Sequence, residues 1–214
     1  MKKALIVWGG WAGHEPRECV ARFEPFLREA EFDITIVDRL DVFADEAHMT
    51  TYDLIVPCWT MGELKPGEEA GLLKAVRAGA GIAGWHGGMG DAFRNNTAYQ
   101  FMVGGQFVEH PGGIIEYTVT ITAPEDAVMD GIRDFKIVSE CYYMHVDPSN
   151  DVLATTAFTG DAYAWVEGCV MPVVWKRSYG EGRVFYSALG HVAADFDVPE
   201  CFEIMKRGML WACR

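Results

Sequence analysis

Hydrophobic positions in the first half of the chain form short apolar runs that alternate with helical patterns. Runs at residues 4–8, 32–37 and 54–58 are typical of buried β-strands, and a fourth leads into "GIAGWHGGMGDAF" at residues 81–93. Helical segments follow the first and third runs, and each begins at a proline, which suits the first position of a helix. Their apolar faces carry Val20, Phe23, Leu27 and Ala30 after Pro16, and Ala70, Leu73 and Val76 after Pro66.

Strands and helices that alternate in this way predict a parallel sheet with helices on both faces. Ligands of such open sheets bind outside the carboxyl ends of the strands. We therefore expect the loops at residues 9–15, 58–65 and 85–93 to meet at one edge of the sheet. Pro25 lies inside the first helical segment and is expected to kink or split that helix, because proline removes one backbone hydrogen bond.

The second half of the chain is richer in strand patterns. Ile115, Tyr117, Val119 and Ile121 alternate with polar residues, which is the two-residue period of a half-exposed strand. No linker separates the halves, so residues 1–214 are expected to form a single α/β domain. Its sheet should be flavodoxin-like and parallel in the N-terminal half, with a β-rich C-terminal elaboration. Further strands are expected at residues 136–144, 152–158, 172–178 and 183–189, with a turn at 179–182 and a final helix at 199–213.

The charge balance narrows the range of partners. The chain has 31 acidic and 18 basic residues and a net charge of −13. This charge argues against nucleic acid and against anionic membranes, since phosphate binding needs clustered Lys and Arg. The six cysteines include no CxxC pair, and the apolar run at residues 4–8 is too short for a signal peptide. We therefore expect a cytoplasmic protein with reduced thiols.

Glycines bracket one reactive side chain in the segment that follows the fourth run. Gly84 and Trp85 precede His86, and Gly87 and Gly88 follow it. Such a bracket is typical of the sharp strand-to-helix turn that presents a nucleophile, where the central residue is usually Ser or Cys. Here the turn presents an imidazole. Cys58 is the alternative nucleophile, but its apolar neighbours predict a buried structural thiol.

Five histidines fall at predicted strand ends or loops, whereas His48 is expected on the surface. Any one of them can be a structural residue held by hydrogen bonds. Several imidazoles at one edge, beside Glu140 and Asp195, are instead suited to acid–base catalysis or to a divalent metal. No compact ligand motif is present, so a metal would draw its ligands from distant segments. The five histidines are His14, His86, His110, His145 and His191.

Tryptophans also gather near the predicted strand ends, where Trp8, Trp11, Trp59 and Trp85 lie at or just beyond the apolar runs. Aromatic faces stack on the apolar faces of sugar rings, so this set favours a carbohydrate pocket. The glycine-rich stretch at residues 9–13 lacks the spacing of nucleotide-binding loops, and no nucleotide is expected.

Together these segments resemble the trehalose-utilisation ThuA-like family, a branch of the class I glutamine amidotransferase-like fold. The resemblance rests on "ALIVWGGWAGHEP", "GIAGWHGG", "FVEHPGG", "SECYYMHVDP" and "MPVVWKRSYGEGRVFYSALGHVAADF". It implies a flavodoxin-like sheet, with His191 near the position of the amidotransferase histidine. Glutaminase activity should be absent, because His86 replaces the cysteine that forms the thioester.

The resemblance also implies a role in trehalose or disaccharide utilisation. A keto-glycoside would be hydrolysed or cleaved by elimination through histidine acid–base chemistry, with Zn²⁺ or a similar metal assisting. The alternative is a non-catalytic sugar-binding or interaction module. A small sugar is the expected substrate, and a homo-oligomer remains open. The expected site residues are His86, His191 and Glu140 for catalysis, Trp11, Trp59, Trp85, Tyr142 and Asp195 for substrate binding, and His14, His110 and His145 for the metal.

Overall fold

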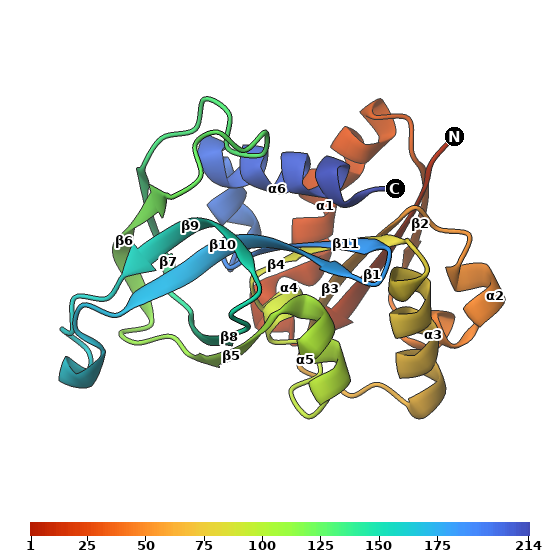
Figure 1. Cartoon of the computed structure of the whole chain (residues 1–214), viewed down its shortest axis with the longest axis horizontal. Helices are drawn as coiled ribbons and strands as arrows, with labels where there is room; N and C mark the ends of the chain where they lie inside the picture. Colours follow the sequence, from red (N-terminus) through yellow and green to blue (C-terminus); the bar gives the residue numbers. More distant parts are fainter.

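A nine-stranded sheet runs through the molecule, which a computed structural model describes over all of residues 1–214 (Figure 1). Its order is β2-β1-β3-β4-β11-β10-β9-β6-β7, and β5 and β8 pair as a separate ribbon. The strands are β1 (Lys3–Gly10), β2 (Asp33–Val37), β3 (Leu54–Thr60), β4 (Gly81–Trp85), β5 (Gly105–Glu109), β6 (Ile114–Ile121), β7 (Phe135–Glu140), β8 (Tyr143–Val146), β9 (Asp151–Ala157), β10 (Val170–Tyr179) and β11 (Gly182–Ser187).

The sheet changes character along its width. Strands β2, β1, β3, β4 and β11 are parallel, whereas β10, β9, β6 and β7 continue the sheet in antiparallel pairs. The expected fold class is therefore confirmed, with β11 returning from the C-terminal half to join the parallel strands. The single strand expected at residues 136–144 is wrong, because Cys141 and Tyr142 leave the sheet and separate β7 from β8.

Helices cover both faces of the parallel part. In Figure 1, α1 and α6 lie on one side of the sheet, and α3 and α5 lie on the other. The helices are α1 (Pro16–Glu29), α2 (Glu46–Met49), α3 (Pro66–Arg77), α4 (His86–Gly90), α5 (Thr97–Val103) and α6 (Pro199–Ala212), with short 3₁₀ turns η1 (Ala12–His14), η2 (Asp41–Ala44), η3 (Ala164–Val166) and η4 (Ala193–Asp197).

Local sequence accounts for the helix boundaries. Pro16, Pro66 and Pro199 each occupy the first turn of a long helix, where the missing N–H has no intrahelical partner to lose. Pro25 does not split α1, which runs without a break to Glu29. The buried apolar face of α1 spans the proline on both sides, and its packing offsets the one lost hydrogen bond.

The core lies between the helices and the central strands. Trp85, Trp175 and Phe185 are almost completely buried, as are residues 4–7 of β1. Helix α6 packs against β4 and β11 so closely that Gly208 meets the ring of Phe185. A Cβ atom at Gly208 would lie 2.1 Å from Phe185 Cε1, so the contact requires glycine.

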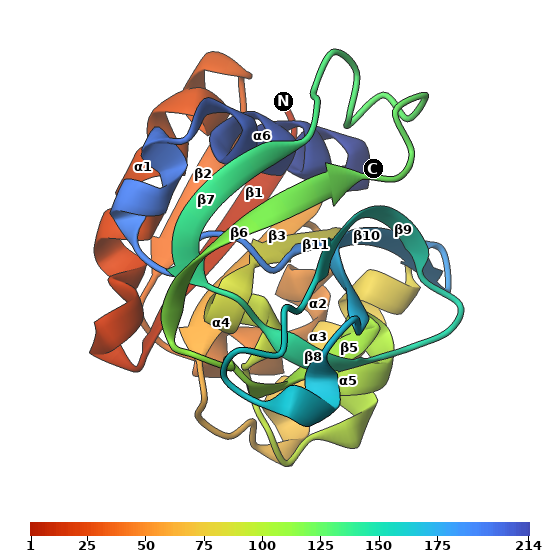
Figure 2. The ribbon, with the colours of Figure 1, turned by 90° about the vertical axis from the view of Figure 1, so that its left-hand side faces the viewer.

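The loops that follow β1, β3 and β4 meet at one edge of the sheet, as the alternating pattern predicts. The backbone N–H of Trp11 donates to the carbonyl oxygen of Thr60 at 3.2 Å, and that of Met61 donates to Asp91 at 2.9 Å. The strands β6 and β7 form the end of the sheet opposite β2, and in the side view they stand in front of the parallel strands (Figure 2). The end of β7 nevertheless approaches α4, since Glu140 lies beside His86. No helix of the protein combines the length and the apolar character needed to cross a bilayer.

Replacement of Gly208 by Ala tests the close packing of α6. Alanine normally favours a helix over glycine, but here its methyl group would enter the space of the Phe185 ring. We expect Gly208→Ala to lower the free energy of unfolding by about 1–3 kcal/mol in urea denaturation. Gly67→Ala in α3 is the matched control, since its Cβ would meet only Ala44 Cβ at 3.8 Å, and it should be neutral or stabilising. A Gly208→Ala variant as stable as the parent would contradict this packing.

Candidate functional site

The carboxylate of Glu140, at the end of β7, is surrounded by imidazoles from three other parts of the chain. Its Oε2 atom lies 3.2 Å from His86 Nε2, 3.2 Å from His191 Nδ1 and 3.8 Å from His14 Nε2. The four side chains are largely shielded from solvent. Each offers one atom that could bind a metal, and these four atoms all lie within 4.8 Å of one another. We call His14, His86, Glu140 and His191 the His/Glu cluster.

His86 is presented by the sharp turn between β4 and α4. Its backbone has φ 40°, a left-handed conformation that costs free energy for a residue other than glycine. The ring is held on two sides, because Nδ1 lies 2.8 Å from the carbonyl oxygen of Ala188 and Tyr142 stacks on the ring face at 3.8 Å between centroids. The strained turn therefore places His86 in one defined orientation.

The glycines after His86 make room for the rest of the cluster. A Cβ atom at Gly87 would lie 2.3 Å from His14 Cε1, and one at Gly88 would lie 2.9 Å from the Cα atom of Cys58. Both contacts are shorter than real Cβ contacts, so any larger residue would displace the His14 ring or the end of β3. The glycine bracket in the sequence therefore serves the approach of neighbouring side chains as well as the turn.

His14 ends the 3₁₀ turn η1 after β1. Its Nδ1 atom pairs with the Thr60 hydroxyl at 2.7 Å, and the Trp11 ring meets the imidazole edge-on at 4.7 Å between centroids. Trp11 is 47% exposed, so it forms part of the outer wall of the cluster.

His191 follows β11 and is positioned by its backbone. The His191 N–H donates to Asp195 Oδ2 at 2.9 Å, and the Ser139 hydroxyl donates to the same oxygen at 2.5 Å. Asp195 thus ties the loop after β11 to β7, the strand that carries Glu140. The Asp195 carboxylate therefore holds the cluster in place, but it is not one of the groups that could bind a metal there.

Burial and mutual charge set the protonation of the cluster. Burial lowers the pKa of His86 to about 4, so this imidazole is neutral near pH 7. Burial alone would raise the pKa of Glu140, but its close polar contacts with the imidazoles of His14, His191 and His86 hold the pKa well below its usual range. Burial likewise would lower the pKa of His191, yet its contact with Glu140 raises it. An ionised carboxylate therefore faces at least one neutral imidazole.

The orientation of His86 leaves two hydrogen-bond acceptors facing each other, its own Nε2 atom and the Glu140 carboxylate. A carbonyl oxygen only accepts hydrogen bonds, so His86 Nδ1 must carry the proton that it shares with Ala188. The neutral ring then directs its Nε2 lone pair at the Glu140 carboxylate. His191 Nδ1 is also buried and has no hydrogen-bond partner of good geometry. A cation between these atoms would satisfy all of them, so the cluster could hold a divalent metal.

Two of the separations within the cluster match those around such an ion, and His14 Nε2 lies somewhat farther, 3.8 Å from Glu140 Oε2. Tetrahedral Zn²⁺ with bonds of about 2.0–2.1 Å separates its ligand atoms by about 3.3 Å. Glu140 Oε2 lies 3.2 Å from each of His86 Nε2 and His191 Nδ1. A hydrogen bond from the ring nitrogen opposite the metal is also the usual support of a histidine ligand, and Ala188 and Thr60 provide such partners.

His110 stands beside the cluster and not within it. Its Nε2 atom lies 3.7 Å from Glu140 Oε1, the oxygen turned away from the other imidazoles, and its side chain is 37% exposed. Phe107 lies between His110 and Tyr142, with ring centroids 5.8 Å and 4.4 Å away. Arg94, which is paired with Asp91, covers Phe107 at 5.4 Å from its ring centroid.

The structure thus brings together some of the residues expected from the sequence and separates others. Tyr142 and Trp11 border the cluster. Trp85 is 2% exposed and packs against Phe23 and Phe196, so its ring belongs to the core. Trp59 packs over the backbone of Gly9 and Gly62. His145 is exposed on β8 and lies outside the cluster, so the expected ligand group of His14, His110 and His145 does not assemble.

Sequence reasoning missed four supporting groups. Thr60, the Ala188 carbonyl, Ser139 and Phe107 hold or border the site residues. Thr60 falls in the loop at residues 58–65 that the sequence already places at this edge of the sheet, so its contribution could have been expected. The other three carry no motif, because their roles depend on how distant strands pair.

Solved structures with similar folds include two ThuA-like proteins. A putative ThuA-like protein from Parabacteroides merdae has a TM-score of 0.78 and 18% identity, covering 99% of this chain and 89% of that chain. One from Bacteroides uniformis has a TM-score of 0.81 and 16% identity, covering 98% and 89%. A cytoplasmic protein from Salmonella typhimurium has a TM-score of 0.59 and 14% identity, covering 86% of each chain. These likenesses concern the fold.

No curated protein sequence matches the chain significantly. The model of the family named ThuA and described as "Trehalose utilisation" matches residues 3–212, which is nearly the whole chain. This description supports a role in carbohydrate utilisation. The chain belongs to the ThuA family.

Proposed function

We propose that the protein is a metal-assisted enzyme that cleaves a keto-glycoside by histidine acid–base chemistry. The observation that carries the proposal is the fixed orientation of His86, whose Nε2 lone pair faces the Glu140 carboxylate inside a buried group of donors. A purely structural cluster would gain more from a hydrogen bond between these two groups. Two acceptors facing each other are instead suited to a cation.

Four side chains would hold the metal: His14, His86, His191 and Glu140. Three imidazole nitrogens and one carboxylate oxygen suit Zn²⁺ or a similar divalent first-row ion. A metal bound there would polarise a carbonyl oxygen of the substrate and stabilise the negative charge that develops on it. Cys58 offers no competing nucleophile, because burial raises the pKa of its thiol well above the usual value. We therefore propose that glutaminase activity is absent.

His110 is the group best placed to move a proton. It lies beside the cluster, its side chain is partly exposed, and its Nε2 atom is 3.7 Å from Glu140 Oε1. In a glycoside with a keto group at sugar carbon 3, the C–H bond at carbon 2 is acidified. His110 would take this proton while the C–H electron pair forms a double bond between carbons 1 and 2. The glycosidic C–O bond breaks in the same process, and the protonated imidazole returns a proton to the departing oxygen.

Aromatic side chains and the overall charge favour a neutral sugar as the substrate. Trp11 is exposed next to His14, and Phe107 lies next to both His110 and Tyr142. Such rings can stack on the apolar face of a sugar. The net charge of −13 disfavours phosphorylated substrates. A cytoplasmic location accords with the six free cysteines.

Metal binding by the untagged protein is the first test. After chelator treatment, the parent protein should bind one equivalent of Zn²⁺ or Mn²⁺ in calorimetry. His86→Ala and His191→Ala should each weaken the affinity for the metal by about tenfold to a hundredfold, because each substitution removes one metal ligand. His145→Ala is the matched control and should bind as the parent does, since this histidine is exposed on β8. Equal affinity in all four proteins would exclude the His/Glu cluster as the site.

Turnover of 3-keto-trehalose tests the assignment of His110. The metal-loaded parent should release free sugar, as followed by chromatography. His110→Ala should lower kcat by about 10²–10⁴-fold while retaining the metal, because it removes the proton carrier but none of the four donors. His145→Ala again serves as the control. Tight binding of the keto-sugar by the parent without any product would instead support a sugar-binding module and contradict the enzyme proposal.

A further inference from the structure

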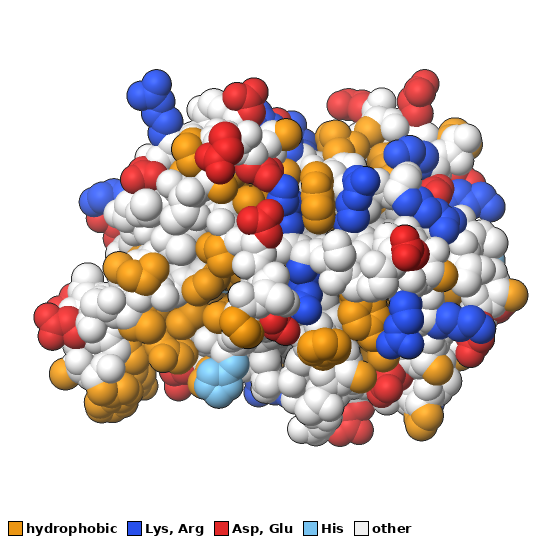
Figure 3. Space-filling model, in the orientation of Figure 1, with side chains coloured by type: hydrophobic (Ala, Val, Ile, Leu, Met, Phe, Trp, Pro, Cys, Tyr) orange, Lys and Arg blue, Asp and Glu red, His pale blue; other side chains and the backbone are white.

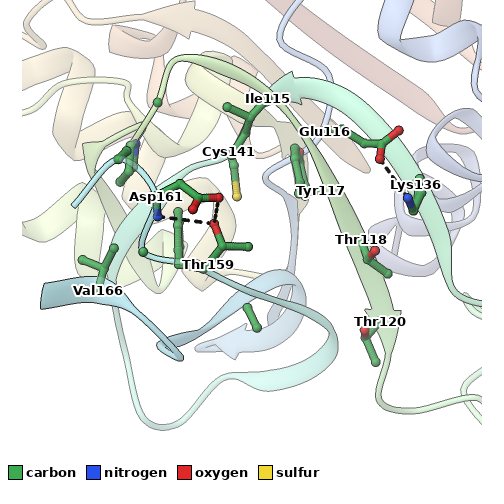
Figure 4. Close-up of a pocket in the computed structure, with 16 residues that line it drawn as sticks. Ile115, Glu116, Tyr117, Thr118, Thr120, Lys136, Cys141, Thr159, Asp161 and Val166 are labelled. Atoms are coloured by element: carbon green, nitrogen blue, oxygen red, sulfur yellow. Dashed lines mark hydrogen bonds and ion pairs between the residues drawn. The ribbon is translucent and has the colours of Figure 1, made fainter. Parts of the chain in front are cut away.

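A cavity of about 550 Å³ opens where β9 separates from β6 (Figure 4). The two strands pair only at Thr120 with Thr155 and at Ile121 with Ala154, and they diverge before these rungs. The loop at residues 158–166 forms the far wall of the cavity. Backbone hydrogen bonds between Phe158 and the residues Gly168 and Cys169 close the base of this loop, so the wall is fixed.

The edge of β6 that faces the cavity has no strand partner. Residues 114–119 pair with β7 on one side only, and no loop backbone bonds to residues 115–119 on the other. The free peptide groups of an edge strand are hydrogen-bond donors and acceptors in a fixed row. They can therefore bind the hydroxyl groups of a ligand that enters the cavity.

The side chains of the cavity combine apolar surface with polar groups. Ile115, Phe158 and Val166 supply apolar contacts. Thr159 and Asp161 supply polar contacts from the loop, and the Thr159 hydroxyl donates to Asp161 at 2.8 Å, which orients both groups. Thr118 and Thr120 also border the cavity, but they project from the face of β6 opposite Ile115 and Tyr117. A few polar groups on an apolar lining are typical of a small-molecule site.

The charges of the lining disfavour anions. Lys136 is the only basic side chain among these residues, and it is paired with Glu116 at 2.8 Å. Asp161 has no basic partner, so the lining is negative overall. A neutral ligand rich in hydroxyl groups, with an apolar ring face, would satisfy the unpaired peptide groups of β6, the Asp161 carboxylate and the apolar surface together.

We propose that this cavity is a second binding site, for a neutral saccharide, distinct from the His/Glu cluster. It borders the segment that carries Glu140, because Cys141 lines the cavity and the Tyr117 hydroxyl donates to the Glu140 carbonyl oxygen at 3.4 Å. The site requires neither the metal nor catalysis, and it shares only its ligand class with the proposed function. A stacked pair of exposed aromatic rings, Tyr163 and Trp165, adds to the apolar surface of the same loop. Hydrophobic side chains gather at the lower left of Figure 3, the end of the molecule where this loop lies in Figure 1.

Trehalose is the test ligand, and amide NMR spectra of the full chain locate where it binds. In the parent protein, titration should shift the amide signals of residues 115–119 and 158–166. Ile115→Trp places a bulky side chain in the cavity, and Asp161→Ala removes a carboxylate that has no basic partner. Each variant should weaken the apparent affinity at these amides by at least tenfold, with well-dispersed spectra confirming the fold. Asp33→Ala, the same substitution as Asp161→Ala but on exposed β2, should bind as the parent does.

Three outcomes would overturn the second site. The first is trehalose shifts confined to amides around His86 and His191, which would leave the proposed function intact. The second is the absence of any shift with trehalose or maltose. The third is a change in the amide signals of residues 115–119 when the protein concentration is raised in the absence of sugar. This result would mean that a second copy of the chain pairs with the edge of β6. Conversely, cavity binding in a protein that binds no metal would support the second site and contradict the proposed function.

Discussion

A buried carboxylate that faces three imidazoles, of which His86 is neutral, is the constraint on which the site depends. An ionised Glu140 without compensation would be costly in this setting, and His86 cannot compensate it by donating a hydrogen bond, because its proton is held by the Ala188 carbonyl. His191 and His14 share the same oxygen, and each is held by its own partner. The supporting hydrogen bonds thus keep the nitrogen and oxygen atoms turned inwards towards one point, where the proposed cation would balance the charge.

The topology explains why both halves of the chain are needed. The parallel strands bring His14, His86 and His191 to one edge, since each follows the carboxyl end of β1, β4 or β11. The carboxylate comes from the antiparallel part, where β7 ends at Glu140 and the chain turns back through Tyr142. The end of β7 therefore places the charged partner beside the imidazoles. The short pairing between β6 and β9 leaves room for the second cavity.

Local patterns in the sequence predict the parallel half of the fold and the turn at His86. Apolar runs, helix-starting prolines and the glycine bracket each act over a few residues, so periodicity reveals them. The ligand set is harder to predict, because it depends on strand pairing across more than fifty residues. His145 and His110 look alike in sequence, yet one is exposed on β8 and the other lies beside Glu140. Trp85 likewise stands at the end of a predicted strand, where a substrate contact was expected. Its ring instead fills the core, because it packs against Phe23 and Phe196.

The protonation of His86 is the most direct test of the account. Nitrogen-15 NMR of the imidazole side chains distinguishes a protonated ring nitrogen from one with a free lone pair. Without metal near pH 7, the account predicts a neutral His86 with its proton on Nδ1, and Zn²⁺ should then shift the Nε2 signal strongly. A doubly protonated His86 that forms an ion pair with Glu140 and does not respond to metal would contradict it.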